Sequence, residues 1–293
     1  MESTPGFRIT KLLTLGEVNM EIRTINLSPE GRVNMKTYIL DSIMNGNKQP
    51  NRAAIIILPG GAFTHLSETE AEPVAFTFAK EGFHTFVLNY SIGDYSEFPN
   101  PLDDVSRAIW EVRQNAGQWG IEANQIVLMG FSAGACVAAM SATQWNTPGL
   151  AERINAPKDS IKPNAAVISY GCSRLSTIFD NKDDENLIIP PPGKITRDRT
   201  PEADVVNYIG PHTPPIFFWH NRYDQYVPVI NPILMGEAMS KHKLPFEMHI
   251  FQNGLHGMSV SNTLSDPSGG RIDPAVAMWV PLCTLWIKSI FKE

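Results

Sequence analysis

Short runs of consecutive apolar residues alternate with amphipathic segments along most of this 293-residue chain. Continuous apolar runs of this kind are typical of strands that are buried on both faces of a parallel sheet. The runs stand at 53–58, 83–88, 126–129, 165–168 and 216–219. Helical patterns lie between them, as at 101–120 and 231–242. We therefore predict an α/β fold with a mostly parallel sheet and helices on both of its faces.

The N-terminal part of the chain follows a different pattern. Apolar and polar residues alternate at 18–27 and again at 33–40, on either side of the turn sequence SPEG. Alternation of this kind is typical of antiparallel strands with one face in solvent. We expect these strands to add an antiparallel edge to the parallel sheet.

One long segment interrupts the alternation of strands and helices. Residues 172–213 are rich in Pro, Asp and Asn and contain no clear strand or helix pattern. Loops of this length are usually functional or disordered. We find no internal repeat and no interdomain linker, so we predict a single domain over 1–293 with an insertion at 172–213. The insertion is expected to be either a lid over the site or a surface excursion.

Composition narrows the classes of partner. Hydrophobic residues make up 43% of the chain and charged residues 18%, which is ordinary for a globular protein. The net charge of −6 and the lack of a Lys/Arg cluster argue against nucleic-acid binding. No apolar stretch reaches the roughly 18 residues of a membrane span, and the N-terminus lacks the pattern of a secretory signal. We therefore expect a cytoplasmic protein that does not bind membranes.

The three cysteines, Cys136, Cys172 and Cys283, are widely spaced along the chain. Their spacing fits neither a disulfide framework nor a zinc site. We expect buried or unreactive thiols, no metal ion and no organic cofactor.

The sequence MGFSAGACVAAM places Ser132 at a sharp change of structure. An apolar strand pattern at 126–129 precedes it and a helix pattern rich in small residues follows at 133–142. Gly130 and Gly134 flank the serine at positions where a tight turn leaves no room for side chains. This context predicts a nucleophile elbow with Ser132 as the nucleophile. The alternative is a glycine turn that contains a serine by chance.

A serine nucleophile needs a base and an acid that orients the base. Among the seven histidines, His256 differs because it lies in a loop between glycines, just after the last strand pattern. Asp224 follows the strand pattern at 216–219 and precedes the histidine in the chain, which is the order found in enzymes that carry their serine on a nucleophile elbow. Since the carboxyl ends of parallel strands share one edge, we expect Ser132, Asp224 and His256 to meet there.

Acyl transfer also needs N–H donors for the oxyanion that forms during attack. The first donor is expected from Ala133, directly after the serine. Glycine-rich sequence follows the strand pattern at 53–58, and glycine lets a backbone approach a substrate closely. We predict that Gly61 and Ala62 supply the remaining donors, the alternative being a simple turn.

The combination of these segments resembles the α/β-hydrolase esterases, in particular the acetyl-esterase and xylan-esterase-like branch near the hormone-sensitive-lipase type. The segments are ILPGGAF, FVLNYSIG, FPNPLDDVSRAIWEVRQNA, GFSAG, PPIFFWHNRYDQYVP and HIFQNGLHGM, within about 50–290. The resemblance implies an α/β-hydrolase fold with catalytic residues at Ser132, Asp224 and His256. The family's oxyanion motif H-G-G-G falls on 59–62, where Pro59 and Ala62 depart from it at positions that act mainly through their backbone.

We therefore expect a serine esterase that works through an acyl-enzyme on a small-molecule ester. The resemblance favours short acyl groups, above all acetyl, on sugars or other polar alcohols. Trp219, Tyr223 and Tyr226, close to Asp224, are candidates for a platform under a sugar ring, although core packing is the favoured role for Trp219. Two alternative functions stay open: an amidase or serine peptidase on the same triad, and a non-catalytic binding protein on this scaffold. Whether the protein forms a homodimer is also open.

Overall fold

The computed structural model describes residues 11–15, 18–41, 43–44, 47–48, 50–179, 187–188, 194 and 201–292. In this part of the chain, nine strands form one sheet in the order β1-β2-β3-β7-β6-β8-β9-β10-β11, and β4 pairs with β5 in a second sheet. The strands are β1 (Lys11–Leu15), β2 (Val18–Asn26), β3 (Asn34–Leu40), β4 (Ile43–Met44), β5 (Asn47–Lys48), β6 (Arg52–Leu58), β7 (His84–Asn89), β8 (Ile121–Phe131), β9 (Ala165–Ser169), β10 (Ile216–Asn221) and β11 (Phe246–Phe251).

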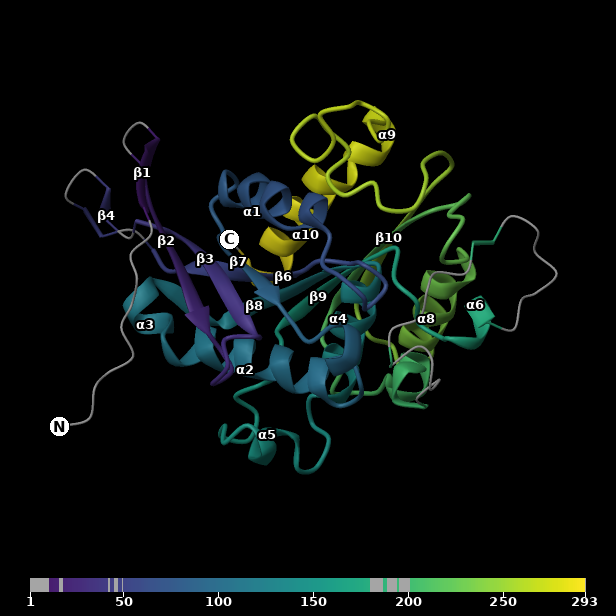
Figure 1. Cartoon of the computed structure of the whole chain (residues 1–293), viewed down its shortest axis with the longest axis horizontal. Coiled ribbons are helices and arrows are strands. Elements are labelled where there is room, and N and C mark those ends of the chain that lie inside the picture. The colour runs from purple at the N-terminus through teal and green to yellow at the C-terminus, as the bar shows by residue number, and fades with distance from the viewer. Residues whose placement is uncertain are drawn as a thin grey trace.

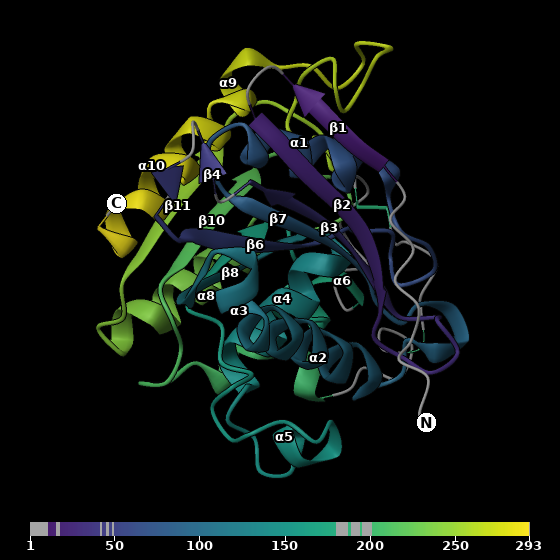
Figure 2. The same ribbon diagram turned by 90° about the vertical axis from the view of Figure 1, so that its left-hand side faces the viewer.

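The direction of the strands confirms the predicted mostly parallel sheet. β7, β6, β8, β9, β10 and β11 pair in parallel, each with its neighbour. The two predicted N-terminal strands, β2 and β3, pair antiparallel, and β3 joins the parallel part through β7. Figure 2 shows this antiparallel edge, to which the structure adds the further strand β1.

Helices cover both faces of the sheet, as predicted. α1 and α10 lie on one face, and α2, α3, α4 and α8 lie on the other (Figure 1). The helices are α1 (Glu72–Ala79), α2 (Asn100–Gln114), α3 (Ala116–Trp119), α4 (Ala133–Gln144), α5 (Leu150–Arg153), α6 (Ser176–Phe179), α8 (Ile230–Lys241), α9 (Pro274–Ala277) and α10 (Trp279–Phe291). Short 3-10 turns are η1 (Glu68–Glu70), η2 (Gly93–Tyr95), η3 (Pro201–Ala203) and η4 (Val205–Tyr208). The helix predicted at 101–120 is therefore two helices, α2 and α3.

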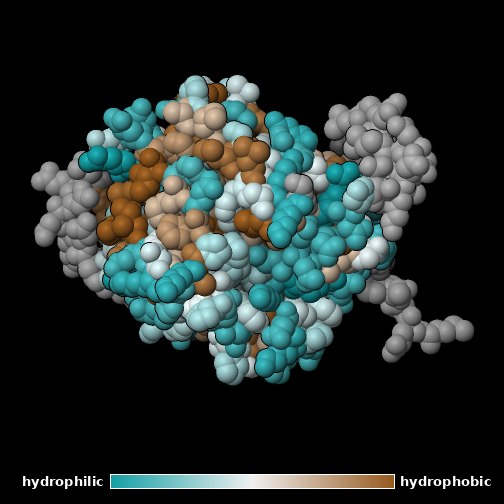
Figure 3. All heavy atoms as spheres, turned by 180° about the vertical axis from the view of Figure 1, so that it is seen from behind, coloured by the Kyte–Doolittle hydropathy of each residue, from teal (hydrophilic) through white to brown (hydrophobic). Residues whose placement is uncertain are grey.

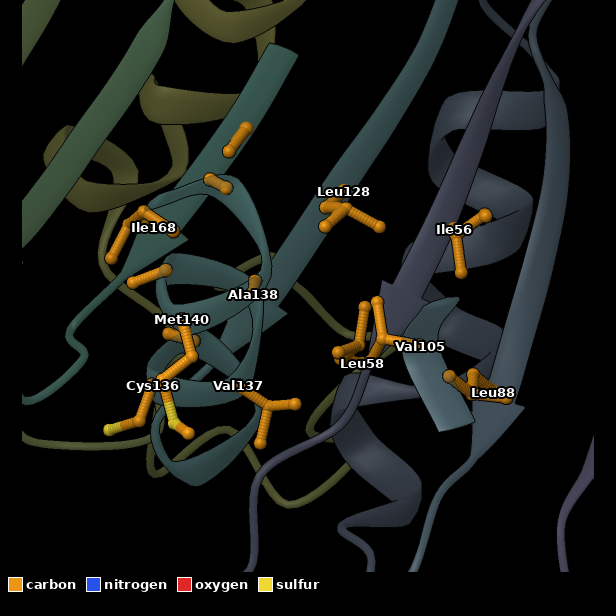
Figure 4. Close-up of a cluster of buried hydrophobic side chains, with 14 of the residues drawn as sticks. Ile56, Leu58, Leu88, Val105, Leu128, Cys136, Val137, Ala138, Met140 and Ile168 are labelled. Atoms are coloured by element: carbon orange, nitrogen blue, oxygen red, sulfur yellow. The ribbon is translucent and has the colours of Figure 1, made fainter. Parts of the chain in front are cut away.

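The apolar run of β6 explains why the sheet needs two layers of helices. Ile56 and Leu58 face the core under α2 and α4, whereas Ile55 and Ile57 face the core under α1 and α10. Figure 4 shows the first of these cores, to which Ile56 and Leu58 of β6, Val105 of α2 and Val137 of α4 all contribute. Because successive strand residues point to opposite faces, a strand buried on both sides must be apolar throughout.

One segment does not follow the expectation about membrane spans. Pro274–Phe291 is 18 residues long with a mean hydropathy of 1.4, enough by length and composition to cross a membrane, and 33% of it is buried. The same composition is typical of a helix packed on a protein core. In α10, Trp279, Cys283 and Ile287 are buried in the core under α1, while Leu285 is exposed. Apolar side chains also gather on the rear surface of the molecule (Figure 3).

The predicted insertion at 172–213 lies partly outside the described residues. Its described ends, 172–179 and 201–213, contain α6 and the turns η3 and η4. The two ends are connected, because Asp204 Oδ1 accepts a hydrogen bond of 2.8 Å from the N–H of Leu175. The choice between a lid and a surface excursion stays a prediction, as does the single domain.

Candidate active site

Ser132 lies in the turn between β8 and α4 with a backbone that few residues adopt. Its φ is 51° and its ψ is −118°, and such strained conformations in non-glycine residues cost about 1–3 kcal/mol. The turn is held because the Ser132 N–H donates to the Ser169 carbonyl at 3.0 Å. A Cβ at Gly134 would lie 2.0 Å from the Leu58 carbonyl oxygen, and one at Gly130 would lie 2.4 Å from the Gly134 oxygen. The glycines are therefore required by close backbone contacts.

The structure brings Ser132, His256 and Asp224 together at the carboxyl ends of β8, β11 and β10. His256 Nε2 lies 2.7 Å from Ser132 Oγ. The other ring nitrogen, Nδ1, lies 2.7 Å from Asp224 Oδ2. Serine and histidine are 124 positions apart in the sequence, and the parallel sheet brings them into contact. The arrangement fits an imidazole that is protonated at Nδ1 and accepts the serine proton at Nε2.

Asp224 is buried, and its charge is nevertheless well stabilised. Oδ1 accepts hydrogen bonds from the N–H groups of Tyr226 at 2.9 Å and Val227 at 2.8 Å. Burial by itself would raise the pKa of Asp224, but His256, His220 and the Val227 N–H outweigh burial and hold the pKa below its usual value. The carboxylate therefore stays ionised behind the imidazole.

In the loop after β6, hydrogen bonds to the backbone carbonyls fix the direction in which the N–H groups of the same peptides point. The Gly60 carbonyl accepts from the Ser67 N–H at 2.9 Å, and the Gly61 carbonyl accepts from Thr64 at 2.9 Å. Carbonyl and N–H point in opposite directions across a trans peptide. The N–H groups of Gly61 and Ala62 thus point away from these turns. Ala133 contributes a third N–H from the first turn of α4, where helical N–H groups have no intrahelical acceptor.

A cavity of about 300 Å³ joins these groups. Its lining includes Ser132, His256 and the three predicted oxyanion donors, while Asp224 lies behind the histidine. The lining residues are Gly61, Ala62, Phe63, Thr64, His65, Ser67, Thr69, Glu70, Ser132, Ala133, Cys136, Cys172, Leu175, Ile178, Tyr226, Val227, His256, Gly257 and Arg271.

One wall of the cavity is apolar and contains two thiols. Cys136 and Cys172 lie together, with the Cys172 N–H 3.2 Å from Cys136 Sγ, next to Leu175 and Ile178. The hydrogen bond with Cys136 and burial raise the pKa of Cys172, so its thiol stays neutral. Within the described residues these thiols belong to no group of three His, Cys, Asp or Glu side chains that could hold a metal ion.

The three aromatic candidates for a sugar platform lie in different environments in the structure. Trp219 is fully buried and stacks on Trp279 at a ring-centroid distance of 4.9 Å, so it belongs to the core. Tyr223 is 62% exposed and lies outside the cavity lining. Tyr226 lines the cavity, and its ring packs at 5.2 Å from that of His256.

Several residues in or beside the cavity carry no sequence signal that would have found them. The His256 ring packs against the ring of Tyr170, with the two centroids 5.0 Å apart. Gln225 accepts a hydrogen bond from the His256 N–H at 3.1 Å. Glu70 and Arg271 also face the cavity. They come from segments far apart in the chain, without a spacing typical of catalysis.

The sequence is similar to a known protein family over most of its length. The model of the family described as BD-FAE matches residues 40–239. The chain belongs to the BD-FAE family. BD-FAE is an α/β-hydrolase family, which confirms both the predicted resemblance and the predicted fold class.

Two curated relatives and one solved structure extend this result. The chain is 30% identical to endo-1,4-beta-xylanase B of Butyrivibrio fibrisolvens over 77% of this chain and 36% of the relative. It is 26% identical to acetylxylan esterase of Xylanibacter ruminicola over 80% of this chain and 45% of the relative. The chain thus spans less than half the length of these relatives. The structure of an acetyl ester-xyloside bifunctional hydrolase from Caldicellulosiruptor lactoaceticus superimposes with a TM-score of 0.71 at 30% identity, covering 91% of this chain and 96% of that one.

Proposed function

We propose that this BD-FAE protein is a serine carboxylic-ester hydrolase for short-chain acyl esters of sugars or other polar alcohols. The observation that carries the proposal is the continuous contact from Ser132 Oγ through the His256 ring to Asp224, at 2.7 Å on each side. A hydroxyl that shares its proton with a neutral, oriented imidazole is a nucleophile at neutral pH.

In the first half-reaction, the Ser132 hydroxyl attacks the ester carbonyl carbon while His256 Nε2 takes its proton. The carbonyl oxygen becomes an oxyanion that accepts hydrogen bonds from the N–H groups of Gly61, Ala62 and Ala133. Asp224 stabilises the imidazolium through Nδ1–H. When the tetrahedral intermediate collapses, the ester C–O bond breaks, and the Nε2 proton passes to the leaving alcohol.

In the second half-reaction, water replaces the alcohol. His256 takes a proton from this water, whose oxygen attacks the acyl carbon of the acyl-enzyme. The same N–H groups hold the second oxyanion. Collapse breaks the bond between the acyl carbon and Ser132 Oγ, and the proton returns to the serine while the carboxylic acid leaves.

The size and lining of the cavity support the substrate class. The cavity of about 300 Å³ has an apolar wall at Cys136, Cys172 and Leu175, which suits a short acyl group. The names of the relatives agree with such substrates: one is an acetylxylan esterase and another acts on acetyl esters and xylosides.

The first prediction concerns the nucleophile. Ser132→Ala removes the attacking oxygen and little volume, so hydrolysis of nitrophenyl acetate should be lost while the urea unfolding curve changes little. Labelling by a fluorophosphonate probe should disappear in the variant. Labelling that persists would show that another residue is the nucleophile, and an unlabelled, inactive wild-type protein would reject the hydrolase proposal.

The second prediction concerns the acyl group. Each methylene that fits an apolar channel gains about 0.8 kcal/mol, roughly a fourfold preference per carbon. In a short cavity, added carbons gain nothing and then clash. We therefore expect kcat/KM to be highest for acetyl to butyryl esters and to fall for octanoyl and palmitoyl esters. A maximum at octanoyl or beyond would contradict the short-acyl proposal, and faster hydrolysis of matched anilides would favour an amidase.

A further inference from the structure

Glu70 is a buried carboxylate beside the catalytic cavity that the mechanism above does not use. Its side chain is 3% exposed, and it lines the cavity with Ser132 and His256. Burying a carboxylate is costly unless hydrogen bonds satisfy it. Both carboxylate oxygens of Glu70 do accept hydrogen bonds, and both donors are uncharged groups of the site. This cost suggests a role for the carboxylate in the geometry of the site.

One of these hydrogen bonds holds the loop after β6 that carries the predicted donors Gly61 and Ala62, which we call the oxyanion loop. The Gly60 N–H donates to Glu70 Oε2 at 2.8 Å, while the carbonyl of the same peptide, from Pro59, accepts from the Tyr90 hydroxyl at 2.7 Å. This peptide is thereby fixed from both sides, directly before the predicted donors. A Cβ at Gly60 would lie 2.7 Å from both Glu70 Oε2 and Ser132 Cβ. The carboxylate and the nucleophile therefore pack against the same point of the loop.

The second hydrogen bond connects Glu70 to the loop that carries the catalytic histidine. The Tyr170 hydroxyl donates to Glu70 Oε1 at 2.7 Å and accepts from the Ser259 N–H at 3.1 Å. The Ser259 hydroxyl in turn donates to the Thr69 carbonyl at 2.6 Å. The ring of Tyr170 also packs edge-on against the His256 ring. A single network thus joins the segment at 69–70 with both sides of the catalytic centre.

The direction of the hydrogen bond from Tyr170 is defined. Burial and the neighbouring Glu70 raise the pKa of Tyr170 well above its usual value. The phenol therefore keeps its proton and donates a hydrogen bond to the carboxylate. Trp279 adds a further anchor, because its indole N–H donates to the Ser259 carbonyl at 2.9 Å.

We propose that Glu70, together with Tyr170, is a positioning residue that holds the oxyanion loop and the histidine loop at the spacing that hydrolysis requires. This inference rests on the proposed hydrolase function. Neither side chain has to touch the reacting atoms. Glu70 acts through the Gly60 amide, and Tyr170 acts through Glu70 and Ser259.

The role predicts a particular kinetic effect. The oxyanion forms only during the reaction. Misplaced donors therefore stabilise the transition state less, while the binding of the substrate in the ground state is nearly unchanged. Loss of one donor typically costs 10²–10³ in kcat, and a displaced loop should cost somewhat less. For Glu70→Ala we expect kcat per active site to fall roughly 10- to 100-fold, with KM changed less than about threefold.

The experiment compares Glu70→Ala, Glu70→Gln and Tyr170→Phe by steady-state hydrolysis of nitrophenyl acetate, with competent sites counted by fluorophosphonate titration. The binding of a trifluoromethyl ketone, which forms an oxyanion adduct with the serine, is measured in parallel. Its affinity should fall by about the same factor as kcat/KM. Glu70→Gln can still accept from Gly60 and donate to the Tyr170 oxygen, so it should restore most of the rate.

Glu72→Ala is the matched control. The Glu72 carboxylate also accepts a hydrogen bond from a tyrosine hydroxyl, that of Tyr38 at 3.0 Å, but Glu72 lies outside the cavity lining. It should keep kcat within about twofold of wild type.

Three outcomes would overturn the inference: kcat per titrated site unchanged in Glu70→Ala, a rate loss without a matching loss of ketone affinity, or Glu70→Gln as impaired as Glu70→Ala. If Glu70→Ala does not fold, Tyr170→Phe decides, because an unchanged kcat and ketone affinity in that variant would equally reject the role. A wild-type protein that neither hydrolyses esters nor reacts with the probe would instead reject the proposed function.

Discussion

At the scale of single residues, the structure determines which oxygen of Asp224 faces the imidazole of His256. Asp224 Oδ1 is committed to the N–H groups of Tyr226 and Val227, which leaves Oδ2 for His256 and, at 3.5 Å, His220. Burial lowers the pKa of His220, against the opposing effects of Asp224 and the Val227 carbonyl. His220 is therefore neutral near pH 7, and the charge of Asp224 acts mainly on His256.

This geometry predicts the effect of Asp224→Asn. The amide oxygen should take the place of Oδ1, so the NH₂ group faces His256 Nδ1. A donor at that position forces the proton onto Nε2, the nitrogen that must accept from Ser132. We expect kcat to fall roughly 10²–10⁴-fold with little loss of stability. Asp94→Asn, on the exposed turn η2, is the control, and a wild-type rate in Asp224→Asn would mean that another carboxylate orients the histidine.

At the scale of elements, the junction of β6, β8 and α4 sets the position of Ser132, the proposed nucleophile. Helix α4 starts at Ala133 and passes so close to the end of β6 that Gly134 would place a Cβ 2.0 Å from the Leu58 oxygen and 2.6 Å from the Pro59 oxygen. The same end of β6 leads into the oxyanion loop. Ser132 and the proposed oxyanion donors are therefore held together by backbone contact between two elements.

A methyl group at Gly134 tests this contact. Gly134→Ala should force β6 and α4 apart, at a cost of about 1–3 kcal/mol or more in the free energy of unfolding. The rate of fluorophosphonate labelling should fall as well, because Ser132 and the oxyanion loop separate. Gly117→Ala in α3 is the matched control, since nothing lies within 4 Å of its Cβ, and it should be neutral or slightly stabilising. Equal unfolding curves for the two variants would contradict the contact argument.

At the scale of the whole molecule, a buried histidine joins the antiparallel edge to the parallel sheet. His84, at the start of β7, accepts from the Leu40 N–H through Nδ1 at 3.1 Å, and its Nε2 lies 3.2 Å from the Gly120 carbonyl. Only the neutral ring protonated at Nε2 satisfies both contacts. Burial is the main reason that the pKa of His84 is lowered from 6.5 to about 4.

The lowered pKa predicts that acid destabilises the protein. Between pH about 6.5 and about 4, the unfolded chain binds a proton at His84 that the folded chain does not, so stability falls as the pH falls through this range. The loss from this residue should reach about 2 kcal/mol near pH 5. Urea unfolding near pH 7 and pH 5 measures it. His84→Gln should reduce the pH dependence and His242→Gln, at an exposed position, should not; equal slopes would refute the prediction.

Much of this protein follows from its sequence, because local patterns report burial. The unbroken apolar run at 53–58 requires a strand covered on both faces, and the glycines around Ser132 require a turn too tight for side chains. These patterns led to the α/β-hydrolase fold class, which the structure and the family confirm. They also led to Ser132, Asp224 and His256, which the structure places in contact.

The tertiary structure alone decided what lies around these three residues. Glu70 lines the cavity and Tyr170 packs against the His256 ring, and no spacing along the chain relates either residue to the pattern of Ser132, Asp224 and His256. Trp219 is a related case, since its position near Asp224 left a place in a sugar platform open beside the favoured core packing, and its contact with Trp279 shows that it packs in the core. The physical reason is the same in both cases: side-chain direction and loop packing depend on contacts between residues far apart in the chain, and local patterns carry no information about those contacts.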